Sequence, residues 1–174
     1  MAEVIKVGIA DLNVCKPPNM ITTIGLGSCV GIAIRDRQTK IGGLVHVMLP
    51  NSKEVKSSAN LAKFADTGIP ELVKRLEKMG AMRSRMVAKI AGGATMFAFQ
   101  SKSELTGIGD RNVAATKAAL KELGIPILAE DCVYRCQYLY QSLSQYLYPN
   151  LYLYRYQYHY HYLYQLQLPD PDAE

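Results

Sequence analysis

Residues 29–49 have the sequence CVGIAIRDRQTKIGGLVHVML, in which two apolar stretches rich in β-branched residues flank a polar segment. Two such stretches joined by a short polar connection predict a pair of antiparallel strands. The strands cover residues 29–35 and 41–49, and residues 36–40 join them. The sequence therefore predicts a β-hairpin over this stretch.

The segments on either side of the hairpin add strands and two helices. The predicted strands are residues 4–10, 85–91 and 125–129, and the predicted helices are residues 60–79 and 110–123. Pro17 and Pro18 exclude helix from the loop after the first strand, and Gly80 and Gly124 fit the positions that end the two helices. Because strands outnumber helices and long βαβ alternation is missing, the predicted fold class is α+β.

The chain has 174 residues and 4 cysteines, and its formal net charge is +5. This length corresponds to one domain with room for an appended tail. Its apolar stretches are shorter than the roughly 18 residues that a membrane helix needs, and its first residues lack the features of a secretory signal. We therefore expect a cytoplasmic protein with free thiols. Lys and Arg are scattered along the chain, which gives no support for nucleic-acid binding.

The composition changes at about residue 133. All 12 Tyr lie between Tyr134 and Tyr164, and every even-numbered position from Tyr152 to Tyr164 is Tyr. Such alternation predicts an extended strand, because alternate side chains then share one face. A single strand over residues 151–168 would span roughly 60 Å, which is too long for a compact domain. We therefore expect a domain at residues 1–131 and an atypical Tyr-rich, period-two tail at residues 132–174.

The tail has two interpretations. Its few charges, its lack of Gly and its alternating Tyr are typical of segments that pair edge to edge, which predicts self-association through residues 134–168. Alternatively, the tail is the product of a simple nucleotide repeat or of a shifted reading frame. His159 and His161 are then members of the repeat, and Cys132 and Cys136 lack a complete ligand set, so no metal site is predicted.

His46 is the single histidine before the tail, and it lies across the predicted hairpin from Cys29. With a two-residue turn at Arg37-Gln38, the two residues face each other with Cβ atoms about 4.5–5.5 Å apart. At that distance the imidazole can take the thiol proton and generate a thiolate nucleophile. A slip of one residue in the register would place the two side chains on opposite faces.

A turn of small residues, containing Gly25, Gly27 and Ser28, precedes Cys29. Small residues let a substrate carbonyl approach the backbone, so the turn at Gly27 and Ser28 is a candidate for stabilising an oxyanion through its N–H groups. This pattern predicts a Cys–His hydrolase or transferase. The alternative is that Cys29 is a core thiol and His46 is a core histidine with satisfied ring nitrogens.

Six blocks of sequence follow one another along the chain. They are TIGLGSCV at 23–30, HVMLP at 46–50, FADT at 64–67, AKIAGGA at 88–94, GIGDRN at 107–112 and LAED at 128–131. Together they resemble CheD, the chemoreceptor glutamine deamidase family, over about residues 4–131. The resemblance favours a nucleophile over a core thiol at Cys29.

The resemblance implies a β-sandwich-like core with helices packed outside, akin to toxin deamidases. It implies hydrolysis of the side-chain amide of selected receptor Gln residues to Glu and ammonia, with no cofactor. By position, the family's triad falls on Cys29, His46 and Thr23, and Thr23 would orient the imidazole. The implied partners are the methyl-accepting chemoreceptors and the CheY-phosphate phosphatase CheC of bacterial or archaeal chemotaxis.

The tail departs from the family pattern. After Asp131 the family continues with a Gly-Gly and Gly-Arg segment and closing strands, whereas this sequence continues with CVYRC at residues 132–136. Two alternatives to an active deamidase therefore stay open. One is a binding module that keeps its receptor or CheC surface without turnover, and the other is a self-assembling protein driven by the tail.

Overall fold

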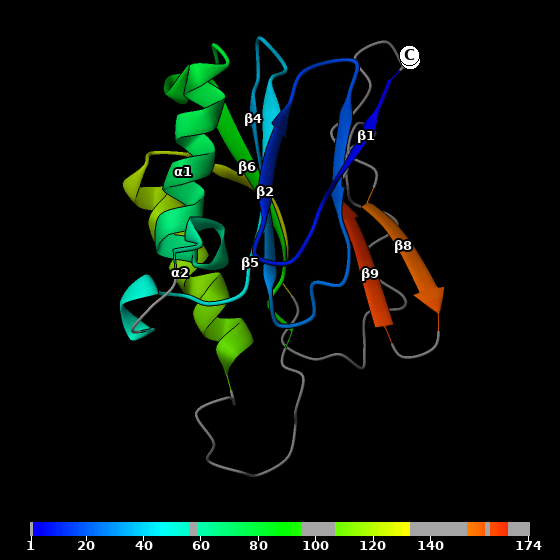
Figure 1. The fold of residues 1–174 in the computed structure, drawn as a ribbon, viewed down its shortest axis with the longest axis vertical. Helices are drawn as coiled ribbons and strands as arrows, with labels where there is room; N and C mark the ends of the chain where they lie inside the picture. The colour runs from blue at the N-terminus through cyan, green and yellow to red at the C-terminus, as the bar shows by residue number, and fades with distance from the viewer. Residues whose placement is uncertain (1, 56–58, 95–106, 133–152, 159–160, 167–174) are drawn as a thin grey trace.

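The centre of the molecule is a five-stranded sheet with the strand order β2-β5-β4-β6-β7 (Figure 1). Its strands are β2 (Leu12–Cys15), β4 (Val30–Asp36), β5 (Gly42–Val47), β6 (Met86–Gly92) and β7 (Ile127–Cys132). All neighbours are antiparallel except β6 and β7, which are parallel. The structure is a computed structural model that describes residues 2–55, 59–94, 107–132, 153–158 and 161–166.

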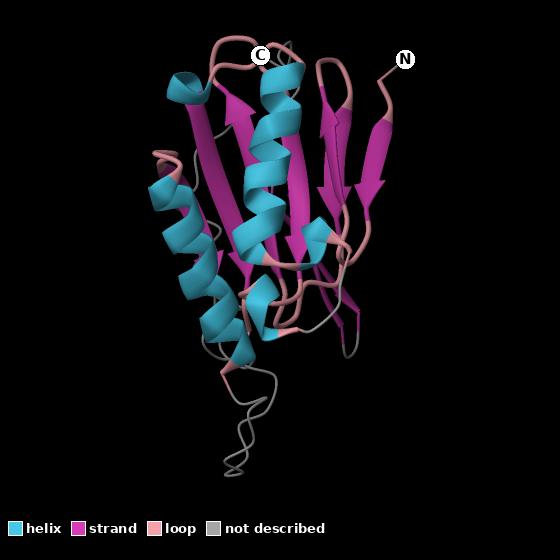
Figure 2. Cartoon of the chain, turned by 60° about the vertical axis from the view of Figure 1, so that its left-hand side comes forward, coloured by secondary structure: helices cyan, strands magenta, loops and turns pink. Residues whose placement is uncertain are grey.

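Helices cover one face of this sheet and a second sheet covers the other (Figures 1 and 2). The helices are α1 (Ala65–Lys78) and α2 (Ile108–Glu122), and the second sheet pairs β1 (Val4–Val7) in parallel with β3 (Met20–Thr23). Three short 3-10 helices connect the elements: η1 (Ser52–Glu54), η2 (Leu61–Lys63) and η3 (Arg83–Arg85). The predicted α+β class is confirmed, with a sandwich-like core and helices outside it.

The side chains of β4 alternate between the two layers, as a pleated strand buried on both faces requires. Val30, Ile32 and Ile34 join the apolar cluster under the helices. Ala33, on the opposite face, joins the smaller cluster against β1 and β3, together with Leu44 of β5. The central hairpin, which contains the candidate residue His46, therefore packs one face against the helices, and the second sheet encloses its other face.

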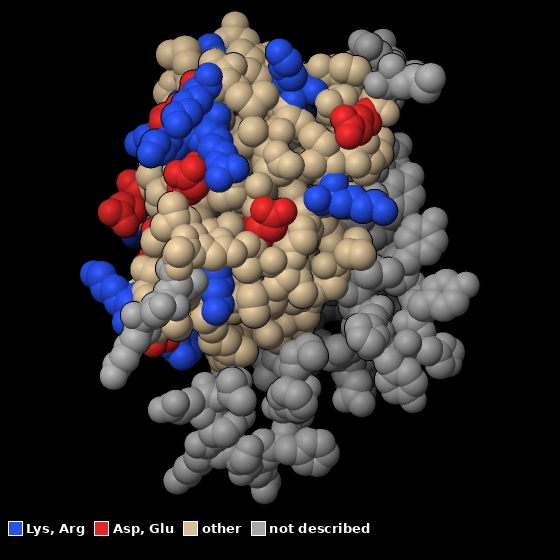
Figure 3. Space-filling model, in the orientation of Figure 1, with Lys and Arg blue, Asp and Glu red and all other residues tan. Residues whose placement is uncertain are grey.

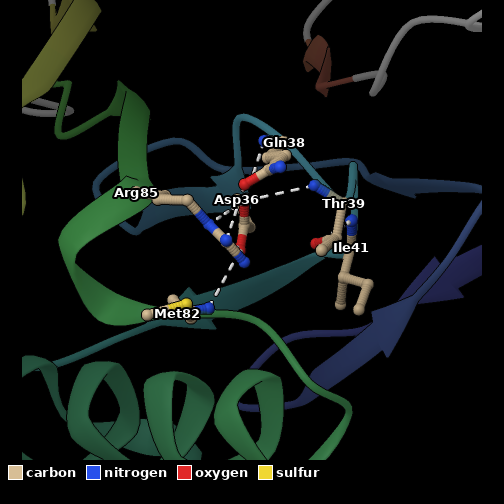
Figure 4. A network of polar contacts seen from close by, with 6 residues as sticks. All are labelled: Asp36, Gln38, Thr39, Ile41, Met82 and Arg85. Carbon is tan, nitrogen blue, oxygen red and sulfur yellow. Dashed lines mark hydrogen bonds and ion pairs between the residues drawn. The ribbon is translucent and has the colours of Figure 1, made fainter.

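The predicted hairpin is confirmed, but its predicted register is wrong. Gly31, and not Cys29, lies opposite His46. The connection spans residues 37–40 instead of a two-residue turn, because the N–H of Asp36 bonds the carbonyl of Ile41 at 2.9 Å across the loop. The Asp36 carboxylate also accepts the N–H groups of Gln38 and Thr39 at 2.8 and 3.2 Å and shapes the longer loop (Figure 4).

Two predicted elements have different boundaries from those expected. The first strand ends at Val7 instead of Ala10, which has a φ of 55° in a turn. The first helix begins at Ala65 instead of residue 60, because Asn60 caps the short η2 and Phe64 is extended before α1. Strand β2 was not predicted at all.

The second half of the described core contains one βαβ unit, β6-α2-β7, although long alternation of this kind is missing. The predicted strand at residues 125–129 lies slightly later, at β7. The helix before it ends at Glu122 and is followed by Gly124, which has a φ of 70°. Gly80 similarly ends α1, with a φ of 103°. Both glycines therefore occupy the left-handed C′ position that their place in the sequence predicted.

Part of the tail forms an antiparallel pair of strands, β8 (Leu153–Tyr158) and β9 (His161–Leu166). The extended conformation predicted from the period of two is confirmed over these strands. They are two short strands and not the single long strand that the sequence analysis excluded. The backbone register pairs Tyr156 with Leu163 and Tyr162 with Gln157, so Tyr does not lie opposite Tyr. Strand β9 runs beside β3 (Figure 1).

Charged side chains of both signs lie next to one another on the face in Figure 3, over α1 and the elements around it. The ion pairs at the surface of the described residues include Arg75–Glu71 and Arg83–Glu77. Within the described residues, no helix combines the length and apolarity that crossing a membrane requires.

Candidate active site

His46 lies in the middle layer of the molecule, near the end of β5. Its side chain is fully buried. Leu44, two residues earlier on the same strand, faces β1 and β3, so the alternation of side chains directs His46 toward the second sheet as well. Thr23, the last residue of β3, meets it there: Thr23 Oγ1 lies 2.8 Å from His46 Nδ1. The structure therefore brings together two of the three predicted site residues across the two sheets.

The hydrogen bonds of Thr23 determine which nitrogen of His46 carries the proton. Thr23 Oγ1 donates to the backbone carbonyl oxygen of Val7 at 2.8 Å. A hydroxyl has one proton, so the same oxygen accepts from His46, and Nδ1 must be the protonated nitrogen. Nε2 is then an unprotonated base, and it is buried with no hydrogen-bond partner among the described residues. The hydrogen bond at Nδ1 thus orients the imidazole, while Nε2 makes no hydrogen bond within the described structure.

Burial also sets the charge of the ring. It lowers the pKa of His46 to about 4, because a charged imidazolium loses its hydration in the apolar interior. His46 is therefore neutral at pH 7, which is the form that accepts a proton. Burial raises the pKa of the Cys29 thiol, and its own backbone N–H partly offsets this. The resting site thus favours a thiol beside a neutral imidazole.

Cys29 is half-buried in the turn that leads into β4. It lies two residues before Gly31, the backbone partner of His46, and directly before the first residue of β4. The predicted direct opposition of Cys29 and His46 is wrong, because the hairpin loop is two residues longer than expected and Gly31 takes the position opposite His46.

The turn before β4 is fastened through three consecutive carbonyl groups. The carbonyl oxygen of Gly27 accepts from Ala94 N–H at 2.8 Å, and that of Cys29 accepts from Gly93 N–H at 2.8 Å. Between them, the carbonyl oxygen of Ser28 accepts from Asn112 Nδ2 at 2.9 Å. The end of β6 and the start of α2 therefore hold the turn from the side away from solvent.

A glycine is required where β6 approaches this turn. Gly92 has a φ of 105°, and a Cβ atom there would lie 2.2 Å from the carbonyl oxygen of Cys29. No other residue fits this approach without moving the backbone. The predicted strand ended at residue 91, directly before this glycine, and the observed β6 ends at Gly92 itself.

Some backbone N–H groups of the turn already donate a hydrogen bond within the protein, and others do not. The N–H of Cys29 donates to the carbonyl oxygen of Leu26 at 2.7 Å and is therefore committed to the turn itself. The N–H groups of Gly27 and Ser28 have no backbone acceptor within the described part of the chain. Their role as donors to a substrate oxygen stays a prediction.

Two contributors to the site were missed by sequence reasoning. Val7 contributes a carbonyl group, which no sequence pattern marks. Asn112 belongs to the block GIGDRN, but its block gave no indication of its role. An amide at a helical position that shares the buried face with Val113 and Leu120 was the signal available.

No set of three metal-ligating side chains occurs among residues that the structure describes. His159 and Cys136, at which the sequence predicts no metal site, lie outside those residues. The described site offers a thiol, a neutral imidazole and backbone N–H groups.

An oriented neutral imidazole on one strand, with a cysteine in the turn that leads into the paired strand, supplies the residue types that cysteine-nucleophile hydrolases use. The family model described as CheD chemotactic sensory transduction matches residues 48–138. A protein of Lachnoclostridium phytofermentans is 63% identical over 131 residues, which cover 75% of this chain and 81% of the relative. A Caldanaerobacter subterraneus protein is 52% identical over 75% of this chain and 80% of its own. Both are named probable chemoreceptor glutamine deamidase CheD. The chain belongs to the CheD family.

Two solved structures are similar to a lower degree. A Neisseria meningitidis protein of family DUF152 has a TM-score of 0.49 and 11% identity, covering 77% of this chain and 64% of that one. The Bacillus licheniformis protein YfiH has a TM-score of 0.45 and 14% identity, covering 71% and 51%.

Proposed function

We propose that the protein is a chemoreceptor glutamine deamidase that converts receptor Gln side chains to Glu and ammonia. The observation that supports this best is the Thr23–His46 hydrogen bond, which leaves the buried Nε2 as an available base on the strand that pairs with β4, and β4 directly follows Cys29 in the chain. The relatives at up to 63% identity, named for this activity, support the same substrate.

The first chemical step is acyl transfer to Cys29. His46 Nε2 takes the thiol proton as the sulfur attacks the amide carbon, so the C–S bond forms while the carbonyl oxygen becomes an oxyanion. The N–H groups of Gly27 and Ser28 stabilise that oxyanion. The imidazolium then returns its proton to the departing nitrogen, the C–N bond breaks, and ammonia leaves a thioester on Cys29.

The second step is hydrolysis of the thioester. Water donates a proton to Nε2 as its oxygen attacks the thioester carbon, and the C–S bond then breaks. The sulfur regains the proton, and the product is Glu. Thr23 keeps the imidazole in one tautomer and one orientation through both steps, as the third group of a triad does. The balance needs one water and no cofactor.

The proposal places the protein in the cytoplasm, where the signalling helices of chemoreceptors lie. It also includes CheC as a binding partner. The proposed location is supported by family membership and by the free thiols of the described cysteines Cys15, Cys29 and Cys132. The proposed partner is supported by family membership.

Mass spectrometry of a receptor cytoplasmic fragment incubated with the full chain tests the activity. A gain of about one mass unit at specific Gln residues is expected with the unmodified protein and is expected to disappear with Cys29→Ala. Cys15→Ala is the matched control, because Cys15 is a buried thiol that donates to the Asn19 carbonyl at 3.7 Å. A gain that persists in Cys29→Ala would contradict the proposed nucleophile.

The alternative function is a binding module without turnover, favoured by the departure of the tail from the family pattern. It predicts capture of CheC or receptor fragments on immobilised protein together with no ammonia release. Ammonia release above the Cys29→Ala background would exclude it.

A further inference from the structure

One side chain connects the nucleophile turn to the strand that carries His46. Asn112 of α2 is fully buried, and its Nδ2 donates to the carbonyl oxygen of Ser28 and to that of Met48, both at 2.9 Å. Ser28 directly precedes Cys29, and Met48 lies two residues beyond His46 at the end of β5. A single amide nitrogen thus joins the two segments on which the reaction depends.

The orientation of this amide is determined by its surroundings. Both groups that face it are carbonyl oxygens, which only accept hydrogen bonds, so the nitrogen and not Oδ1 must face them. Oδ1 is buried and has no partner among the described residues. Within the described structure, the Asn112 side chain therefore makes hydrogen bonds only through Nδ2.

Among the three fastenings of the turn, this one alone comes from a side chain. Gly27 and Cys29 are held by the backbone N–H groups of Ala94 and Gly93. Asn112 adds the contact that reaches past the turn to β5, which the β6 contacts do not make. Its removal therefore frees the turn relative to His46 without changing the backbone donors.

We infer that Asn112 is a positioning residue, which fixes the distance between the Cys29 thiol and His46 Nε2 by bonding the carbonyl groups of Ser28 and Met48. This inference rests on the proposed function for its effect on turnover. Proton transfer between the thiol and the imidazole is sensitive to such a displacement, because a misplacement of about 1 Å can reduce a rate by about a hundredfold.

The expected consequence is a loss of kcat with little change in KM. In Asn112→Ala, receptor deamidation is expected to fall about 10- to 100-fold in kcat, while KM stays within about twofold, because the amide touches no substrate surface. Asn112→Asp is expected to lose as much, since it keeps the size but removes both donated hydrogen bonds.

Leu120→Ala is the matched control on the same helix. Leu120 is also fully buried, and it belongs to the apolar cluster under α2. Its truncation weakens the packing of α2 without touching the turn. It is expected to lower the melting temperature at least as much as Asn112→Ala, yet to leave kcat within about twofold at 25 °C. A loss of kcat in Leu120→Ala as large as that in Asn112→Ala would overturn the positioning role.

A second measurement needs no receptor. Iodoacetamide alkylation of the full chain, followed by peptide mass spectrometry, reports the reactivity of the Cys29 thiol, with Cys15 as an internal reference. His46→Ala and Asn112→Ala are each expected to slow alkylation of Cys29 about tenfold. The double variant is expected to be no slower than His46→Ala alone, because both changes act through one thiol–imidazole contact.

The outcomes separate the inference from the function. If the unmodified chain deamidates no receptor but the alkylation pattern holds, the proposed function fails and the positioning role stands. If the chain is active and Asn112→Ala matches it in kcat and alkylation, the positioning role is wrong and the function stands. Losses that multiply in the double variant would also overturn the positioning role.

Discussion

The two ring nitrogens of His46 have different surroundings, and that difference gives the residue its chemistry. Nδ1 donates to Thr23, which itself donates to the Val7 carbonyl oxygen, so the chain of donors runs in one direction. Nε2 lies buried with no partner in the described structure. An unsatisfied buried acceptor costs stability, and sites of this kind are commonly retained because a reaction uses them.

The first prediction concerns Thr23. Thr23→Val removes the acceptor for the Nδ1 proton, so the imidazole loses its fixed tautomer, and we expect kcat to fall at least about tenfold. Thr23→Ser keeps the hydroxyl and is expected to retain most activity. Thr22→Val is the control, because Thr22 is also buried but its hydroxyl has no partner among the described residues. Equal activity in Thr23→Val and the unmodified chain would contradict the role given to Thr23.

The second prediction concerns pH. The pKa of His46 is about 4 in the folded protein, below its ordinary value of 6.5. Between pH 4 and 6.5 position 46 binds more protons in the unfolded chain than in the folded protein. The contribution of the neutral His46 to the free energy of unfolding is therefore complete above pH 6.5 and decreases as the pH falls to 4. The free energy of unfolding is expected to drop by roughly 3 kcal/mol over that window. Urea unfolding at several pH values measures it.

The matched variant for that measurement is His46→Gln. It has no titrating group at position 46, so the part of the pH dependence between 4 and 6.5 is expected to disappear. A profile that is unchanged in His46→Gln would show that another group titrates in this window.

At the scale of elements, the loop between β4 and β5 depends on one buried carboxylate. Asp36 is fully buried, and it accepts Met82 N–H at 2.9 Å and forms an ion pair with Arg85, whose NH2 lies 2.7 Å away (Figure 4). These donors, together with the N–H groups of the loop, hold its pKa well below the usual range although burial alone would raise it. The hairpin register and the entry to β6 are therefore fixed at the same point.

The third prediction is that Asp36→Asn destabilises the fold by about 3 kcal/mol, because it leaves the Arg85 guanidinium without its buried counter-charge. Glu77→Gln, in the exposed pair with Arg83, is the control and is expected to change stability by less than about 1 kcal/mol. Chemical unfolding at pH 7 compares the two. Below pH 4 the difference between Asp36→Asn and the unmodified chain is expected to shrink, because Asp36 of the unfolded chain takes up a proton there while the folded protein keeps the carboxylate, which favours unfolding.

At the scale of the whole molecule, the layers meet at the candidate site. Thr23 comes from the two-stranded sheet, His46 from the five-stranded sheet and Asn112 from the helical layer. The site is therefore sensitive to anything that separates the layers. The strands β8 and β9 of the tail bear on this, since β9 lies next to β3, the strand that carries Thr23 (Figure 1).

The fourth prediction is that the tail drives self-association. Light scattering of the full chain at micromolar concentration is expected to show large particles, and the chain ending at Cys132 is expected to be small and monodisperse, because few charged residues protect the tail strands. Lys substituted for Tyr156 and Tyr162 in the full chain is the milder variant and is expected to reduce assembly. Small monodisperse particles in every sample would rule this role out.

The sequence by itself determined the features that arise from neighbouring residues. Two runs rich in β-branched residues, joined by a polar segment, predicted the hairpin, and Gly80 and Gly124 predicted where the two helices end. These signals are local, because they depend on side-chain period and on the conformations that one residue allows. The resemblance to CheD added the three residues of the proposed triad, although it gave neither their contacts nor their protonation.

Only the tertiary structure decided how those residues meet. The hairpin register depends on a buried carboxylate whose partners include Met82 and Arg85, far along the chain, so a count of turn residues predicted the wrong partner for His46. The tautomer of His46 depends on the Val7 carbonyl, and the position of Cys29 depends on Asn112. The physical reason is that these contacts form between layers, where side-chain packing and hydrogen bonding across distant segments decide geometry, and no local period records which segments will be adjacent.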